Sequence, residues 1–169
     1  QKGLSFLNLA FTQRPPDDLI ERLGNILEAN VTSQRRREER IIITPDSTKK
    51  LNLASKGAQV IVDNVPRKAL LRDISFGGAK VIMPGIPQFL LNKPTTMNFF
   101  FEEPTETLTV PGKIVRFEAV EGRTDIAAFA VQFEESLTPM AYKMRLSEYL
   151  RPIKAPAARK GESGGTTQT

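Results

Sequence analysis

The strongest constraint on the fold is a series of short strand-like segments between residues 40 and 134. Most are rich in β-branched or aromatic residues, turn residues separate them, and no long helical pattern interrupts the series. The predicted strands are residues 40–44, 58–64, 68–73, 80–83, 95–103, 107–117 and 125–134. Short strands at this spacing are typical of a sandwich or barrel, so we predict a mainly β fold, a small antiparallel barrel of about six strands.

A helical pattern precedes the strands. Pro16 and the two aspartates after it are typical of a first helical turn, because carboxylates complement the positive end of the helix dipole. The apolar residues that follow share one helix face: Leu19, Ile20, Leu23, Ile26 and Leu27. We expect this helix to fade near residues 30–32. Because residues 1–14 alternate weakly, as a strand does, we predict that residues 1–33 are an N-terminal strand and helical linker, which could end an upstream domain.

A second helical pattern closes the barrel domain. Thr138 can cap a helix that has Pro139 at its first position, and Pro152 can end it. The residues on its apolar face are Tyr142, Leu146, Tyr149 and Leu150. Beyond this helix the chain is rich in small and polar residues. We therefore predict a barrel domain with a C-terminal helix at residues 34–151 and a flexible tail at residues 152–169.

The chain contains no cysteine, histidine or tryptophan. The usual zinc sites, Ser-His-Asp triads and cysteine nucleophiles are therefore excluded, and no pair of carboxylates is placed for acid–base catalysis. We predict a binding module that is not an enzyme, with no catalytic site, no metal and no cofactor. The absence of cysteine agrees with a reducing cytoplasm, and we find neither a signal-peptide pattern nor an apolar run of about 20 residues for a membrane span. We therefore expect a cytoplasmic chain with no membrane partner.

Positive charge is in excess and localised. The chain has 24 Lys and Arg against 19 Asp and Glu, a formal net charge of +5, and the surplus gathers around residues 35–40 and 154–160. A localised charge suits a small anionic ligand better than a long polyanion, for which an extended basic stripe is expected. We therefore predict no nucleic acid polymer among its partners.

Two short motifs contain residues that could bind such a ligand. Arg36 and Arg40 form an R-x-x-x-R pattern ahead of the first strand, and Asp73, Ser75 and Gly78 form a D-x-S-x-x-G pattern at a strand end. Each alone has an ordinary structural interpretation. The arginines could pair with neighbouring glutamates at a helix end, and the Asp and Ser could bond their own backbone in a β-turn. The joint occurrence of the motifs in this order favours a binding site.

In this order and strand context, the motifs resemble those of the PilZ domain family, bacterial receptors for the second messenger cyclic di-GMP. The resemblance covers residues 34–151, and residues 112–116 and 130–133 resemble the family's later strands, with Ala130 where the family often has glycine. It implies a PilZ-type six-stranded antiparallel β-barrel and a non-enzymatic cyclic di-GMP receptor. The implied ligand-binding residues are Arg35, Arg36, Arg40, Asp73, Ser75, Gly77 and Gly78.

The chemistry of these residues fits the two phosphates and two guanines of cyclic di-GMP. An arginine can bind a phosphate, bond guanine O6 and N7, or stack on a purine. Asp73 can accept from guanine N1–H and N2–H, and Ser75 can donate to an oxygen. Gly77 and Gly78 permit close backbone approach. The resemblance implies the same roles, and further implies that Arg35 favours a stacked pair of ligands.

We expect the ligand to order an arm formed by residues 35–40 over the face that carries residues 73–78. The ordered arm would then reorient upstream parts of the chain or a protein effector. Two alternatives remain open. One is a PilZ-like adaptor that binds protein rather than nucleotide. The other is an OB-like barrel that binds single-stranded nucleic acid through the arm and the phenylalanines at residues 99–101, although two of the three are expected in the core.

Overall fold

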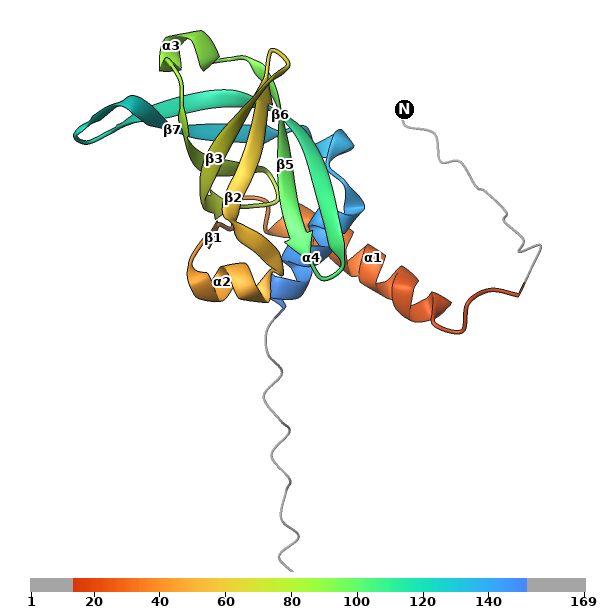
Figure 1. The fold of residues 1–169 in the computed structure, drawn as a ribbon. Coiled ribbons are helices and arrows are strands. Elements are labelled where there is room, and N and C mark those ends of the chain that lie inside the picture. The colour runs from red at the N-terminus through yellow and green to blue at the C-terminus, as the bar shows by residue number, and fades with distance from the viewer. Residues whose placement is uncertain (1–13, 152–169) are drawn as a thin grey trace, which may run out of the picture.

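The structure, a computed structural model, describes residues 14–151 (Figure 1). The predicted N-terminal strand and the predicted tail at residues 152–169 lie outside the described residues. The strands are β1 (Ile41–Ile42), β2 (Leu53–Val62), β3 (Val65–Ile74), β4 (Gly78–Pro84), β5 (Pro94–Glu102), β6 (Thr105–Val120) and β7 (Arg123–Phe133). Each strand predicted from the sequence overlaps one of these.

Six of the strands close into an antiparallel barrel. The order along the sheet is β1-β3-β2-β5-β6-β7-β4, and an additional pairing of β3 with β4 joins the two sides. Every pair in this ring is antiparallel. β1 lies outside the ring, where Ile41 pairs with Ile74 and Ile42 pairs with Asp73 at the end of β3. The predicted six-stranded barrel is therefore confirmed.

Helices cover both ends of the barrel. They are α1 (Leu19–Arg35), α2 (Pro45–Lys50), α3 (Pro87–Leu90), the 3-10 turn η1 (Glu135–Leu137) and α4 (Met140–Leu150). In Figure 1, α1, α2 and α4 lie at one end and α3 at the other. The short helices α2 and α3 replace predicted turns, because Pro45 and Pro87 fit a first helical turn. Thr138 does not cap α4 as predicted, since its hydroxyl donates to the Glu134 carbonyl at 2.9 Å. No described helix is both long and apolar enough to cross a bilayer.

Aromatic side chains fill the space between the barrel and α4. Phe99, Phe133 and Tyr142 are 0 %, 3 % and 0 % exposed, and their ring centroids lie 5.2–6.1 Å apart. Leu146, one helical turn after Tyr142, is also fully buried. The apolar face predicted for the C-terminal helix is therefore the face that closes the barrel.

The three consecutive phenylalanines divide between core and surface. Phe99 and Phe101 are 0 % and 2 % exposed, whereas Phe100 is 37 % exposed. The guanidinium of Arg145 covers the ring of Phe101 at 4.2 Å from its centroid. One partly exposed ring does not make a row of stacking surfaces, so the geometry gives the OB-like alternative no support.

α1 differs from its predicted extent and orientation. The helix continues through residues 30–32, where we expected it to fade, and ends at Arg35. It packs against α4, and its buried residues are Ala29 and Ser33. Packing against α4 outweighs the low helix propensity of the Asn-Val-Thr segment. Most of the predicted apolar stripe, including Ile20 and Leu27, faces solvent instead.

Tyr142 connects α4 to the end of β3. Its phenol donates a hydrogen bond to the Ser75 carbonyl at 2.9 Å. Burial raises the pKa of Tyr142 above its usual value, because the charged phenolate is poorly solvated there. The unfolded chain releases this proton near pH 10 but the folded chain does not, so this group removes stability as the pH rises above about 10.

We expect Tyr142→Phe to lower the free energy of unfolding by about 1–2 kcal/mol at neutral pH, because the buried Ser75 carbonyl loses its donor. The variant should also lose less stability than the wild type when the pH is raised from about 9 to about 11. Urea unfolding at both pH values measures this, with Tyr149→Phe at a partly buried position as the control. The same pH dependence in wild type and Tyr142→Phe would show that the phenol does not contribute.

Candidate ligand-binding site

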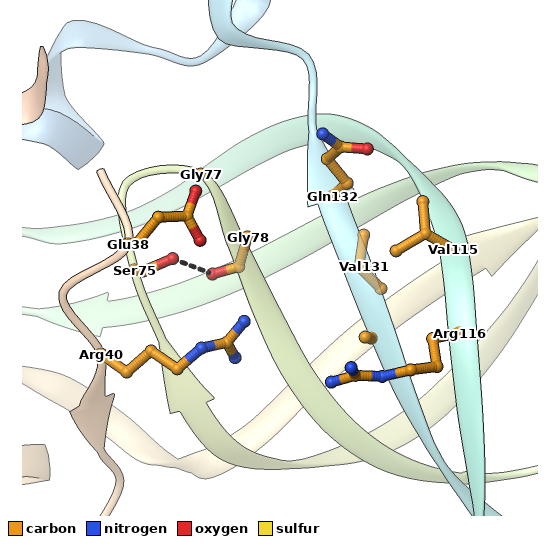
Figure 2. A pocket seen from close by; sticks show the side chains of 10 residues that line it. Glu38, Arg40, Ser75, Gly77, Gly78, Val115, Arg116, Val131 and Gln132 are labelled. Atoms are coloured by element: carbon orange, nitrogen blue, oxygen red, sulfur yellow. Dashed lines mark hydrogen bonds between the residues drawn. The ribbon is translucent and has the colours of Figure 1, made fainter.

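A cleft opens on the outer surface of the barrel, where the arm approaches β4, β6 and β7 (Figure 2). Its volume is about 390 Å³. The arm and the link between β3 and β4 form one wall, and β6 and β7 form the other. The lining residues are Glu38, Arg40, Ser75, Gly77, Gly78, Val115, Arg116, Ala130, Val131 and Gln132. We call this cavity the outer cleft.

Three contacts hold the arm on the barrel. The Arg37 carbonyl accepts a hydrogen bond from the Gly77 N–H at 3.2 Å. The Arg37 guanidinium pairs with Glu135 at 2.5 Å, and Arg40 Nη1 pairs with Asp73 Oδ1 at 2.5 Å. The two motifs predicted from the sequence therefore meet in space. The arm therefore lies on the barrel in this structure, with the two motifs side by side.

The link between β3 and β4, residues 75–78, is a tight backbone turn. The Ser75 N–H and hydroxyl both donate to the Gly78 carbonyl, at 2.8 Å and 3.2 Å, and the residue is 1 % exposed (Figure 2). This agrees with the structural interpretation of the motif, in which the serine bonds its own backbone. A Cβ at Gly78 would lie 2.4 Å from the Val131 carbonyl, so glycine is required there by the close approach of β4 to β7.

The predicted residues fall into two groups. The ones that line the outer cleft are Arg40, Ser75, Gly77 and Gly78. Asp73 pairs with the Arg40 side chain and lines a neighbouring cavity of about 330 Å³. Arg36 donates instead to the Leu150 carbonyl at the end of α4, at 2.9 Å, and Arg35 is the exposed last residue of α1. The structure therefore brings Arg40 to the turn but does not bring Arg35 or Arg36 to the cleft wall.

The far wall of the outer cleft was not predicted from the sequence. Its polar side chains are those of Arg116 and Gln132, and Figure 2 shows the guanidinium groups of Arg40 and Arg116 directed toward each other across the cleft. Strict alternation from the buried Ile114 would turn Arg116 into the core. The pairing of β6 with β7 shifts register between Ile114 and Arg116, and this bulge directs Arg116 outward. A bulge of this kind leaves no clear signal in one sequence.

Charged side chains give the outer cleft a mixed but mainly cationic lining. The Arg116 side chain is 64 % exposed, with its guanidinium 3.7 Å from Glu118. Lys80 donates a hydrogen bond to Glu118 at 2.6 Å, and this bond lowers the pKa of the Glu118 carboxyl group. Glu118 therefore remains anionic and is held mainly by Lys80, which leaves Arg116 able to contact a ligand. Two opposed guanidinium groups suit phosphates or a purine face.

Metal ligands do not gather in the part of the chain that the structure describes. Residues 14–151 contain no group of three or more acidic side chains that could hold a metal ion. The outer cleft itself contributes one carboxylate, Glu38, beside its two arginines. Its lining offers charge, hydrogen bonds and purine stacking.

Comparison with known families identifies the domain. A family model described as the PilZ domain matches residues 34–151. The chain belongs to the PilZ domain family. A second model, the PilZN3 domain, matches residues 1–30, so the boundary between the two matches falls within α1.

Two relatives of this PilZ chain illustrate the similarity. One, named "Cyclic di-GMP binding protein", comes from Treponema denticola and is 48% identical over 157 residues, which are 93% of this chain and 50% of the relative. The other is the crystal structure of the Borreliella burgdorferi PlzA protein in complex with c-di-GMP. It matches with a TM-score of 0.53 and 27% identity over 82% of this chain and 50% of PlzA. The chain thus spans about half the length of each of these relatives.

Proposed function

We propose that this chain is a non-enzymatic receptor domain for cyclic di-GMP, which binds in the outer cleft between Arg40 and Arg116. The observation that carries the proposal is that Arg40 of the first motif lines one cleft with Ser75 and Gly78 of the second. The Arg40–Asp73 pair and the Arg37–Gly77 backbone contact hold the two motifs together there. Membership of the PilZ domain family and the c-di-GMP complex of PlzA support the choice of ligand. Cyclic di-GMP is the ligand in this proposal, and no cofactor is proposed. We expect the chain to act in the cytoplasm.

Each ligand group has a suitable partner. Arg40 and Arg116 would bind phosphate oxygens or stack on a guanine from opposite walls. Arg40 engages Oδ1 of Asp73, which leaves Oδ2 to accept a hydrogen bond from guanine N1–H or N2–H. A Cβ at Gly77 would lie 3.1 Å from the Arg37 side chain, so glycine at this position lets the arm pack closely on the turn beside the ligand.

Arg36 could couple ligand binding to a conformational change, which a receptor requires. Its guanidinium donates to the Leu150 carbonyl, and α4 is also tied to α1 through the Arg151–Glu28 pair at 2.8 Å. We propose that a ligand phosphate replaces the Leu150 carbonyl as the acceptor for Arg36. Binding would then loosen the contact between α4 and α1 and reorient whatever is attached to α1, including a protein effector.

Arg35 sets the expected stoichiometry. It is exposed at the last turn of α1, one residue before Arg36, and no described contact of its side chain holds it against the barrel. We propose that it stacks on or bonds a second molecule of cyclic di-GMP once the first occupies the outer cleft. The ligand would then bind as a stacked pair.

Isothermal titration with cyclic di-GMP tests this function, and we expect a saturable heat with two ligands per chain. Arg36→Ala and Arg40→Ala should each weaken binding at least about 10-fold, because each removes charge-assisted hydrogen bonds. Thermal stability should change by no more than about 1 kcal/mol, since both residues make partly exposed contacts. Arg123→Ala, which breaks an exposed pair with Asp125 away from the cleft, is the matched control.

The result separates the receptor from the adaptor. An adaptor that binds protein would give no saturable heat at micromolar ligand. Wild-type affinity in Arg40→Ala would show that the ligand does not bind in the outer cleft.

A second titration tests the role of Asp73. We expect Asp73→Ala to weaken binding of cyclic di-GMP and to reduce its preference over cyclic di-AMP, because adenine has no N1–H or N2–H for a carboxylate to accept. The ratio of the two dissociation constants measures the effect, and the Asp46→Ala variant on α2 is a control. Equal losses for both ligands would mean that Asp73 only positions Arg40.

A further inference from the structure

α1 carries an apolar face that the rest of the described chain does not cover. Ile20, Leu23, Leu27 and Val31 are 87 %, 50 %, 65 % and 48 % exposed. Their spacing of three or four residues places them along one side of the helix. In Figure 1, the N-terminal part of α1 extends away from the barrel. A continuous exposed apolar stripe of this kind is typical of a contact surface. We call it the outer face of α1.

The contact of α1 with α4 uses a different side of the helix. The buried residues of α1 are the small Ala29 and Ser33, and Glu28 pairs with Arg151 just after α4. The four residues of the outer face of α1 therefore do not hold the helix on this domain. An amphipathic helix normally buries its apolar stripe, so another part of the protein is needed to cover the outer face of α1.

The comparison with families points to what covers it. The PilZN3 model matches residues 1–30, which joins residues 1–13 and most of α1 in one unit. Residues 1–13 are themselves rich in apolar side chains: Leu4, Phe6, Leu7, Leu9 and Phe11. In an extended segment, Leu7, Leu9 and Phe11 would share one face. The same unit therefore holds two apolar surfaces joined by a short link at residues 12–18.

We propose that the outer face of α1 is the docking surface for residues 1–13 of the same chain. Residues 12–18 contain Pro15 and Pro16 and would reverse the chain direction. Phe11 would then lie near Ile20, and Leu7 near Leu27.

The lengths of the two surfaces agree with this arrangement. Four strand steps from Leu7 to Phe11 cover about 13 Å. Seven helical steps from Ile20 to Leu27 cover about 10 Å. Because the two distances are similar, both apolar pairs can form along the same stretch.

This arrangement makes α1 a helix shared by two units. Its inner side packs on α4 of the PilZ domain. Its outer face would pack on residues 1–13, which belong to the PilZN3 match. A rigid shared helix passes a movement at the arm directly to the upstream segment. The docking does not depend on which ligand the outer cleft binds.

The absence of cysteine allows a direct test in the 169-residue chain. We expect the pair Leu7→Cys and Leu27→Cys to form an intrachain disulfide under mild oxidation at least about 10-fold faster than the pair Asn8→Cys and Leu27→Cys. The control has nearly the same sequence separation, but Asn8 points to the opposite side of an extended segment. Thiol titration and electrophoresis without reductant measure the rates, and thermal unfolding of the reduced variants confirms that they fold.

Three results would overturn the proposal. Equal rates for the two pairs would show that residues 1–13 do not dock in this register. Disulfide-linked dimers of the single Leu27→Cys variant in preference to the intrachain product would show that a second copy covers the outer face of α1. A hydrogen-exchange experiment provides a test that is independent of cysteine chemistry. The Leu27→Ser substitution should speed amide exchange in residues 1–13, whereas the control Glu21→Ser should not. The same exchange rates in both variants would also contradict the docking.

Discussion

The pairing of β1 with the end of β3 is the contact on which the site depends. Ile41 is 3 % exposed and pairs with Ile74, so the position of β1 is fixed by the core. Arg40 lies two residues before Ile42, which pairs with Asp73, so Arg40 and Asp73 are diagonal neighbours on one face and their side chains meet. A buried side chain thus fixes the place of an exposed one, and the arginine of the first motif meets the carboxylate of the second as a consequence of sheet register.

α4 contacts both the turn at residues 75–78 and the arm, and it connects them to α1. Tyr142 bonds the Ser75 carbonyl, and the last carbonyl of the helix, at Leu150, accepts from Arg36. One short helix therefore contacts the turn of the site, the arm and, through Arg151 and Glu28, the N-terminal helix. Under the proposed exchange of acceptors, the free energy that a ligand gained at Arg36 would be opposed by the loss of the hydrogen bond to the Leu150 carbonyl. This difference between the two states is what a conformational response requires.

The sequence predicted the elements better than it predicted their faces. Alternation and turn residues located the barrel strands, and the apolar face of α4 was correct down to Tyr142 and Leu146. The length of α1 could not be predicted, because packing on α4 extends it beyond its local propensity. The R-x-x-x-R and D-x-S-x-x-G patterns identified both sides of the arm contact. Arg116 was missed, because a bulge in β6 reverses its expected direction.

We have proposed that cyclic di-GMP binds in the outer cleft, between the arm and β6. Arginine Nε–Hε resonances of the isotope-labelled chain, assigned by Arg→Lys substitutions and followed during addition of cyclic di-GMP, test it most directly. We expect large shifts for Arg36, Arg40 and Arg116 and none for Arg145, which hydrogen-bonds to Glu106 and covers the ring of Phe101. Shifts confined to Arg145 and Arg151, which line a separate cavity of about 380 Å³ with Lys50, would contradict it.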